Sequence, residues 1–348
     1  MAAASLLLIL LVAPLWLRSA LPQPSQAQQI RIERLDVPLA QRRLGPFRLA
    51  GAWQLTSRNS SFGGYSALIR PQPGRLLAIS DGGYFLDFAE PTDAPVLAGL
   101  QSARMAPALA VAGLRKADRD VEAASWDPLS QQMWLALEGR NAVVRQGTDM
   151  VPRALRVIPE WAEWSGNTGP EAMTRLRDGR FVALCECYSG WTDQTGHPGF
   201  IFASDPTLGV AATRFTFAGA PGYRPTDMAQ LPDGRLLVLM RRLLWPAPAR
   251  FAAKLMLADP AAIRLNGVRG GVRGGVLAAT ELADLSAPLP VDNFEALAIE
   301  LQPGGGLTAW LMSDDNAAVS QRTLLWRLDF RISDLPPMQK APGSAGRL

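Results

Sequence analysis

Gly169–Glu186 has the sequence GPEAMTRLRDGRFVALCE, and this stretch predicts a β-hairpin. Its first strand opens on Glu171, Asp178-Gly179 forms the turn, and an apolar second strand ends on Glu186. Asp-Gly between two strand-like runs is a strong hairpin signal because a two-residue primed turn requires positive φ angles. Further copies of this pattern along the chain would therefore indicate the architecture.

The same hairpin pattern occurs four more times, and a third strand-like run usually follows each copy. The other copies are Gly64–Asp81, Val121–Glu138, Pro225–Arg241 and Phe294–Asp314. Short strands that repeat at roughly 50-residue intervals are typical of β-propellers. Convincing amphipathic helices, which alternating βαβ units would need, are missing from the pattern.

We therefore predict an all-β fold, a β-propeller of four-stranded antiparallel blades. Five blades are visible in the sequence and we expect six in total. The sixth would be degenerate around residues 84–118 or split between the termini. Because a ring closed by both chain ends has no exposed edge, we expect Ile30–Val37 to lie beside Leu324–Phe330.

The N-terminus predicts export. An apolar run, Ala2–Leu17, precedes a small-x-small site at Ser25-Gln26-Ala27, as in a signal peptide spanning residues 1–27. The run is shorter than the roughly 20 residues of a membrane span, and no Lys or Arg precedes it, so an uncleaved anchor is the alternative. Residues 28–335 would form one domain, without stable membrane insertion after cleavage, and 336–348 a disordered tail.

Charge and cysteine content exclude several classes of partner. The sequence pI is about 9.4, but the chain has three lysines and no basic tract, so we expect a monomer that binds no nucleic acid. Cys185 and Cys187 would share one face of a strand. Their Cα atoms would then lie about 6.5–7 Å apart, at or beyond the disulfide range, so we expect two buried free thiols.

Acidic residues recur at equivalent places in the copies. In a propeller the first strands line the central channel, so these carboxylates should converge near the axis. The first strands contribute Glu122, Glu171, Asp227 and Glu295, aligned with Ser66, and the second strands end on Asp81, Glu138, Glu186 and Asp314. Such a cluster must bind a cation, pair with arginine or take up protons. A set of oxygen ligands favours Ca²⁺ first and Mg²⁺ second. The alternative without a metal is that each acid caps a turn or pairs with a nearby arginine.

With these motifs, the chain resembles the family described as "esterase-like activity of phytase", a phytase-like domain of exported bacterial proteins. The segments that carry the resemblance are FGGYSAL and LLAISDGG (within 62–83), DVEAASWD and LALEG (120–139), GPEAM and DGRFVALCE (169–186), YRPTDMAQLPDGRLLVLMRR (223–242), and DNFEALAIE, LMSDDN and QRTLLWR (292–327). The resemblance implies a β-propeller with a phosphoesterase site in the periplasm or outside the cell. It assigns no nucleophile and no substrate.

The resulting hypothesis is a metal-dependent hydrolase of small phosphorylated or ester substrates, acting through a metal-activated water. Glu171 and Glu295 would be catalytic, and the arginines Arg241, Arg242 and Arg322 would bind phosphate. The metal ligands would be Glu122, Glu171, Asp227, Glu295, Asp81, Asp314 and Glu186. A metal-dependent lactonase or carboxylesterase and a non-catalytic binding propeller remain open. A Ser-His-Asp hydrolase is disfavoured because His197 is the sole histidine and G-x-S-x-G is absent.

Overall fold

The computed structural model describes residues 24–337 except 93–99, 110–114, 116–117, 165–168, 189–193, 247–248, 264–267, 270–271 and 274. Its regular elements are β-strands and short 3-10 helices, and within the described residues no helix is long and apolar enough to cross a membrane. Most of the predicted signal peptide and of the predicted tail lies outside these residues.

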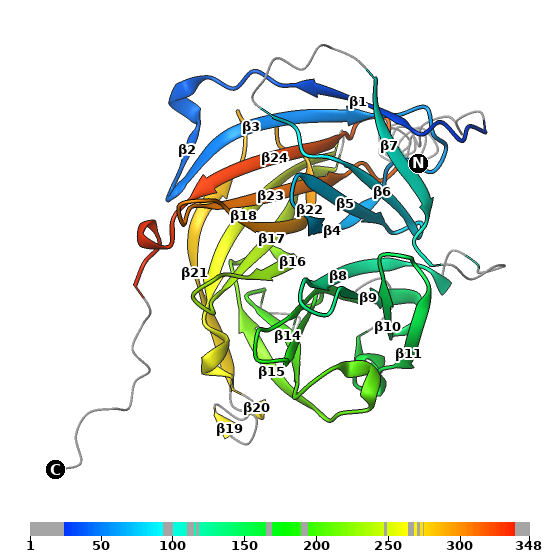
Figure 1. The fold of residues 1–348 in the computed structure, drawn as a ribbon. Coiled ribbons are helices and arrows are strands. Elements are labelled where there is room, and N and C mark those ends of the chain that lie inside the picture. The colour runs from blue at the N-terminus through cyan, green and yellow to red at the C-terminus, as the bar shows by residue number, and fades with distance from the viewer. Residues whose placement is uncertain are drawn as a thin grey trace, which may run out of the picture.

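Most strands belong to a 10-stranded, an 8-stranded and a 4-stranded sheet. Within these sheets lie five runs of four antiparallel strands, which we call units and which are arranged like the blades of a propeller (Figure 1). Each unit begins with a hairpin found in the sequence. In unit order the strands are β4 (Tyr65–Gln72), β5 (Arg75–Ser80), β6 (Tyr84–Ala89) and β7 (Leu100–Pro107) in unit 1; β8 (Val121–Asp127), β9 (Gln132–Leu137), β10 (Ala142–Gly147) and β11 (Pro152–Val157) in unit 2; β12 (Pro170–Arg175), β13 (Phe181–Cys185), β14 (Gly196–Phe202) and β15 (Ala212–Ala218) in unit 3; β16 (Arg224–Gln230), β17 (Leu236–Pro246), β18 (Ala249–Ala258) and β21 (Val276–Leu285) in unit 4; and β22 (Asn293–Leu301), β23 (Leu307–Asp314), β24 (Thr323–Phe330) and β3 (Phe47–Thr56) in unit 5.

The Asp-Gly turns differ in detail from the two-residue turn we predicted. In the hairpin of unit 3, Leu176 N donates to Arg180 O, so three residues form the loop. Only Gly179 has a positive φ, +92°. A turn of this length places glycine at the left-handed position, whereas a primed type I′ turn would need positive φ at two residues. Asp233-Gly234 in unit 4 follows the same pattern.

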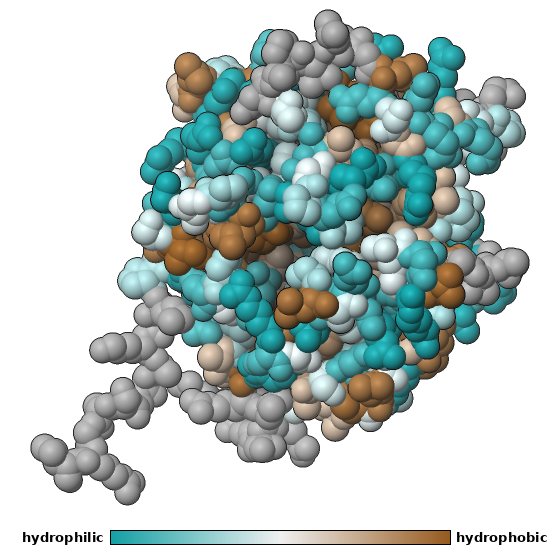
Figure 2. All heavy atoms as spheres, viewed as in Figure 1, coloured by the Kyte–Doolittle hydropathy of each residue, from teal (hydrophilic) through white to brown (hydrophobic). Residues whose placement is uncertain are grey.

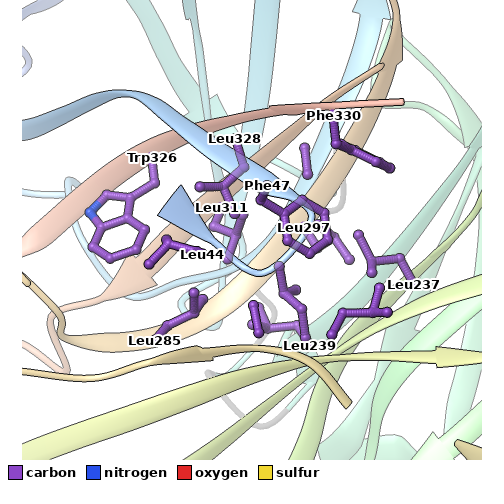
Figure 3. Close-up of a cluster of buried hydrophobic side chains, with 14 of the residues drawn as sticks. Leu44, Phe47, Leu237, Leu239, Leu285, Leu297, Leu311, Trp326, Leu328 and Phe330 are labelled. Carbon is purple, nitrogen blue, oxygen red and sulfur yellow. The ribbon is translucent and has the colours of Figure 1, made fainter. Parts of the chain in front are cut away.

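The first strands of neighbouring units contact each other around a closed ring, in the order β4, β8, β12, β16, β22 and back to β4. Five clusters of buried hydrophobic side chains lie between successive units. Figure 3 shows the cluster between units 4 and 5, where Phe47 and Leu297 pack near Leu239. The ring is therefore held by hydrophobic packing at each interface, whereas the face shown in Figure 2 is largely hydrophilic with scattered apolar residues.

Two predictions about closure are wrong. A strand from the N-terminal part of the chain does pair with one from the C-terminal part, but β24 pairs with β3 and not with residues 30–37 (Figure 1). β3 suits the inner place because it is buried on both faces, whereas β1 (Gln29–Arg34) has exposed residues on one face and bridges β3 to β7. Residues 84–118, one of our two candidates for a sixth blade, supply β6 and β7 of unit 1, so the described part of this segment forms no separate sheet.

Candidate metal centre

Each first strand carries a β-bulge at the same level of the ring. The bulge leaves one residue without a partner on the second strand, and bulges commonly re-aim a side chain near a functional site. The bulged residues are Ser66, Glu122, Glu171, Thr226 and Glu295. We call these bulged residues, together with the second-strand residues Asp81, Glu138, Glu186, Arg241 and Asp314 that lie next to them, the acidic mouth.

The fourth bulge corrects our alignment by one residue. Thr226, and not Asp227, occupies the position of the three glutamates. Asp227 is 1% exposed, and its carboxylate accepts the backbone N–H of Met228 at 2.7 Å and of Leu297 at 2.6 Å. Burial raises the pKa of this carboxyl, and both backbone N–H groups oppose the rise. Asp227 therefore ties β16 to β22, and the structure does not bring it into the acidic mouth.

The two hydroxyl residues at the bulges also join neighbouring units. Ser66 donates its hydroxyl to the carbonyl of Val121, and Thr226 donates to the carbonyl of Phe294 at 3.2 Å. Both acceptors immediately precede a bulged glutamate. The bulges of units 1 and 4 thus hold the backbone next to Glu122 and Glu295.

A second ring of side chains follows the second-strand residue opposite each bulge. Four of these residues are carboxylates and one is a cation, the five being Asp81, Glu138, Glu186, Arg241 and Asp314. Arg241 Nη2 lies 3.0 Å from Glu186 Oε1 and 3.0 Å from Glu295 Oε1. The arginine that we predicted to bind phosphate is thus the counter-ion of acids from the units on either side.

Four carboxyl groups of the acidic mouth have raised pKa values. Burial, followed by repulsion from neighbouring carboxylates, raises the pKa of Glu122, Glu171 and Asp314 well above its ordinary value. Burial raises the pKa of Glu295 to about 7, and Arg241 opposes this rise. Arg241 binds Glu186 and Glu295, and buried carboxylates without such a partner must take up protons or bind a cation.

Unit 2 brings three carboxylates together. Asp120, Glu122 and Glu138 are half-buried, and each offers an oxygen within 4.8 Å of the other two. Among the described residues, this is the one group of three or more Asp, Glu, His or Cys side chains whose possible ligand atoms all lie within 4.8 Å of one another. Glu138 also accepts the backbone N–H of Gly169 at 2.8 Å, and a Cβ at Gly169 would lie 2.4 Å from Glu138 Cγ. Glycine in the GPEAM motif therefore makes room for this carboxylate.

Asp120 was missed in the sequence analysis. It stands two residues before Glu122, and residues i and i+2 of an extended segment point to the same side. That spacing was the available signal, but no other repeat carries an acid at this place: the equivalents are Gly64, Gly169, Arg224 and Asn293.

The other predicted phosphate-binding arginines lie near aromatic or acidic partners. Arg242 stacks over Tyr223, with its guanidinium carbon 4.6 Å from the ring centre. Arg322 Nε lies 3.5 Å from Asp292 Oδ2. Arg224 comes within 3.9 Å of Glu186, and its side chain is 43% exposed, so it is an accessible cation beside the mouth.

The cysteines form a disulfide, so the prediction of free thiols is wrong. β13 ends at Cys185 and the chain bends beyond it, which brings the Cα atoms of Cys185 and Cys187 to 5.1 Å. This separation is within the normal disulfide range. The bridge encloses Glu186 and fixes the backbone on both sides of a residue in the acidic mouth.

Comparison with known proteins identifies one family. The family model Phytase-like, described as "Esterase-like activity of phytase", matches residues 60–317. No curated protein matches the chain. Hydrazine synthase of Kuenenia stuttgartiensis is 11% identical, with a TM-score of 0.37, and the match covers 74% of this chain and 58% of that one. A chain of a nidogen/laminin complex is 9% identical, with a TM-score of 0.39 and coverage of 84% and 91%.

Proposed function

The chain belongs to the Phytase-like family, and on that premise we propose that it is an exported, metal-dependent hydrolase of phosphoesters. The observation that carries this proposal is the group Asp120, Glu122 and Glu138, whose oxygens lie within 4.8 Å of one another and remain partly exposed. Carboxylates in this arrangement suit Ca²⁺ or Mg²⁺, and Ca²⁺ tolerates an irregular set of oxygen ligands better.

The residues fit a cation on the side of the mouth away from Arg241, which is paired with Glu186 and Glu295. A divalent cation bound there would polarise a phosphoryl oxygen and lower the pKa of a water molecule. Burial raises the pKa of Glu171 well above its ordinary value, so this carboxyl suits the role of proton donor to the leaving oxygen. Glu295, with a pKa of about 7, suits proton acceptance.

The substrate would need cations at the edge of the mouth. Arg224 would serve here, because its side chain is 43% exposed and its guanidinium lies 3.9 Å from Glu186 and 5.2 Å from the centre of the Tyr188 ring. Arg242 and Arg322 would add charge if the substrate drew them from Tyr223 and Asp292. A lactonase or carboxylesterase is the second candidate, and the excess of carboxylates favours it because an uncharged ester is not repelled.

We further propose a five-bladed ring and export as a monomer to the periplasm or the cell exterior. The five interfaces with their own hydrophobic clusters support the blade number. The Cys185–Cys187 disulfide supports an oxidising compartment, where such bonds persist.

The test is hydrolysis by the purified protein of p-nitrophenyl phosphate, inositol hexakisphosphate and a panel of lactones, in EDTA, Ca²⁺ or Mg²⁺. We expect cation-dependent phosphate release that Glu122→Gln reduces by more than 100-fold. Glu163→Gln is the matched control, because Glu163 is 40% exposed and pairs with Arg214 on the surface. Lactone turnover without phosphate release would favour the second candidate. Cation binding without turnover of any ester would leave a binding protein.

A further inference from the structure

A cavity of about 710 Å³ lies at the end of the channel opposite the acidic mouth, and we call it the distal cavity. The bulged residues of the mouth stand near the beginning of the first strands, whereas the distal cavity is lined where these strands end. Its volume falls within the roughly 300–1,000 Å³ of small-molecule sites. Every unit contributes to the wall, most regularly through the residue four positions after each bulge, namely Arg70, Trp126, Arg175, Gln230 and Ile299.

Apolar side chains line the distal cavity at two levels. Leu68, Met228 and Leu297 stand two positions after their bulges and are only 2–3% exposed. Leu129 and Leu301 also line the cavity, and they are 93% and 64% exposed. Large apolar side chains that remain exposed around a cavity favour a ligand with an apolar body.

The three arginines that line the distal cavity differ in their partners. Arg70 pairs with Glu90 and Glu300, so two carboxylates balance one guanidinium and no positive charge is left over. Arg177 is exposed, and its Nη1 donates to the carbonyl of Pro232. One of its N–H groups is therefore already committed to the backbone.

Arg175, the third arginine, has long contacts to its acceptors. Its Nη2 lies 3.7 Å from Asp127 Oδ2, and its Nη1 donates to the carbonyl of Leu176 at 3.4 Å. Charge-assisted N–O hydrogen bonds ordinarily measure about 2.7–2.9 Å. Asp127 has other donors, because it accepts the N–H of Leu129 at 3.1 Å and the hydroxyl of Ser130 at 2.7 Å. The Arg175 side chain is 26% exposed, so a ligand in the cavity can reach a cation that is only loosely held.

Two further neighbours of Arg175 leave its guanidinium available. The centre of the Trp134 ring lies 6.0 Å from the guanidinium carbon, and an arginine over an aromatic face keeps its N–H donors for another partner. Asp178 and Arg175 attract each other, but Arg180 binds that carboxylate at 2.7 Å. An incoming anion therefore displaces no short hydrogen bond from the side chain of Arg175.

We propose that the distal cavity binds a small monocarboxylate with an apolar chain or ring. The carboxylate lies against the planar fork of N–H donors of Arg175, and the apolar body is buried against Leu68, Met228 and Leu297. One loosely held guanidinium matches one carboxylate. The distal cavity includes no carboxylate of the acidic mouth, so this inference does not depend on a bound cation or on ester hydrolysis.

Isothermal titration calorimetry of the full chain with octanoate, in EDTA at pH 7.5, tests the proposal. We expect one equivalent of octanoate to bind to the wild type. 1-Octanol, which has the same apolar chain without the charge, should bind at least tenfold more weakly. Absence of octanoate binding at millimolar concentration, or equal affinity for the two probes, would overturn the inference.

Variants of the wall place the binding site. Arg175→Met keeps the apolar stem and should weaken octanoate binding at least tenfold. Arg145→Met is the matched control, because Arg145 is 25% exposed and pairs with Asp205 outside the cavity, and it should bind octanoate within twofold of the wild type. Near-ultraviolet circular dichroism checks that each variant is folded. Unchanged octanoate affinity in folded Arg175→Met would contradict the proposal.

Leu129→Glu decides the question if Arg175→Met does not fold. Leu129 is almost fully exposed, so the change adds a negative charge beside the cavity without disturbing the core. It should weaken octanoate binding at least threefold relative to Leu129→Gln, and equal affinities would reject the site. Octanoate binding without hydrolysis of any ester leaves the distal site and removes the hydrolase proposal. Hydrolysis without octanoate binding does the reverse.

Discussion

Replacing Arg241 with methionine should destabilise the protein in a strongly pH-dependent manner. Arg241 is the counter-ion of Glu186 and Glu295, with N–O distances of 3.0 Å to both. Its side chain is 21% exposed, and those of the two glutamates are 9% and 10% exposed. Methionine preserves the apolar stem of the side chain, so the change removes mainly the charge.

The magnitude follows from the burial of these pairs. Removing one partner of a buried ion pair costs about 3–5 kcal/mol, and we expect a loss of this size in the free energy of unfolding at pH 8 without added cation. The pKa of Glu295 is about 7 even with Arg241 beside it. At pH 5.5 this carboxyl is therefore protonated in the wild type as well, and the loss should fall to about 1–2 kcal/mol.

Urea denaturation in EDTA at pH 8 and pH 5.5, followed by tryptophan fluorescence, measures both values. Arg214→Met is the control, because the Arg214–Glu163 pair is 48% and 40% exposed, and it should cost at most about 1 kcal/mol at either pH. An equal loss for Arg241→Met at the two pH values, or a loss at pH 8 no larger than that of the control, would refute the reasoning.

Three other predictions concern the mouth and its support. In EDTA, the free energy of unfolding of the wild type should fall as pH rises from 5 to 8. The reason is that a carboxyl group whose pKa is raised in the folded state binds more protons there than in the unfolded state over this pH range. The rise in the pKa of Glu295 from 4.5 to about 7 accounts for about 3 kcal/mol. Saturating Ca²⁺ should flatten this slope in the same titration, and a rise with pH would contradict the assignment. Asp227→Ala leaves two buried N–H groups without an acceptor and should cost roughly 2–4 kcal/mol while calcium stoichiometry stays unchanged; loss of a calcium equivalent would restore Asp227 as a ligand. Cys185→Ala/Cys187→Ala should cost only about 1–2 kcal/mol in denaturant unfolding because the closed loop is very short, and a loss above 4 kcal/mol would point to a larger structural role.

The repeated hairpins could be predicted because each carries its own local signals. Turn residues and apolar second strands recur in every copy, an acid stands at one or both strand ends, and all five copies form hairpins at the expected places. These signals also located Glu122, Glu171 and Glu295 at one level of the ring. Long-range pairing was less predictable, because β1 and β3 both resemble strands and only burial on both faces distinguishes the one that closes the ring.

The errors within the site have local causes. We aligned Asp227 with the glutamates because it is acidic. The paired residues directly before the bulges are Pro170, Pro225 and Phe294, and aligning Pro225 with Pro170 would have placed Thr226 at the position of Glu171. The disulfide was missed because we extended the strand through Cys187, although β13 ends at Cys185. Arg241 was visible as a cation near the acids, but only the register shows that it replaces a carboxylate of the second ring.

The central claim is that the acidic mouth holds a divalent cation at Asp120, Glu122 and Glu138. Crystals grown with Mn²⁺ in place of Ca²⁺, with diffraction data collected at the manganese absorption edge, test it most directly. We predict an anomalous peak within bonding distance of oxygens from all three side chains. An anomalous map without a peak in the mouth at millimolar Mn²⁺, in crystals where these side chains are ordered, would contradict the account.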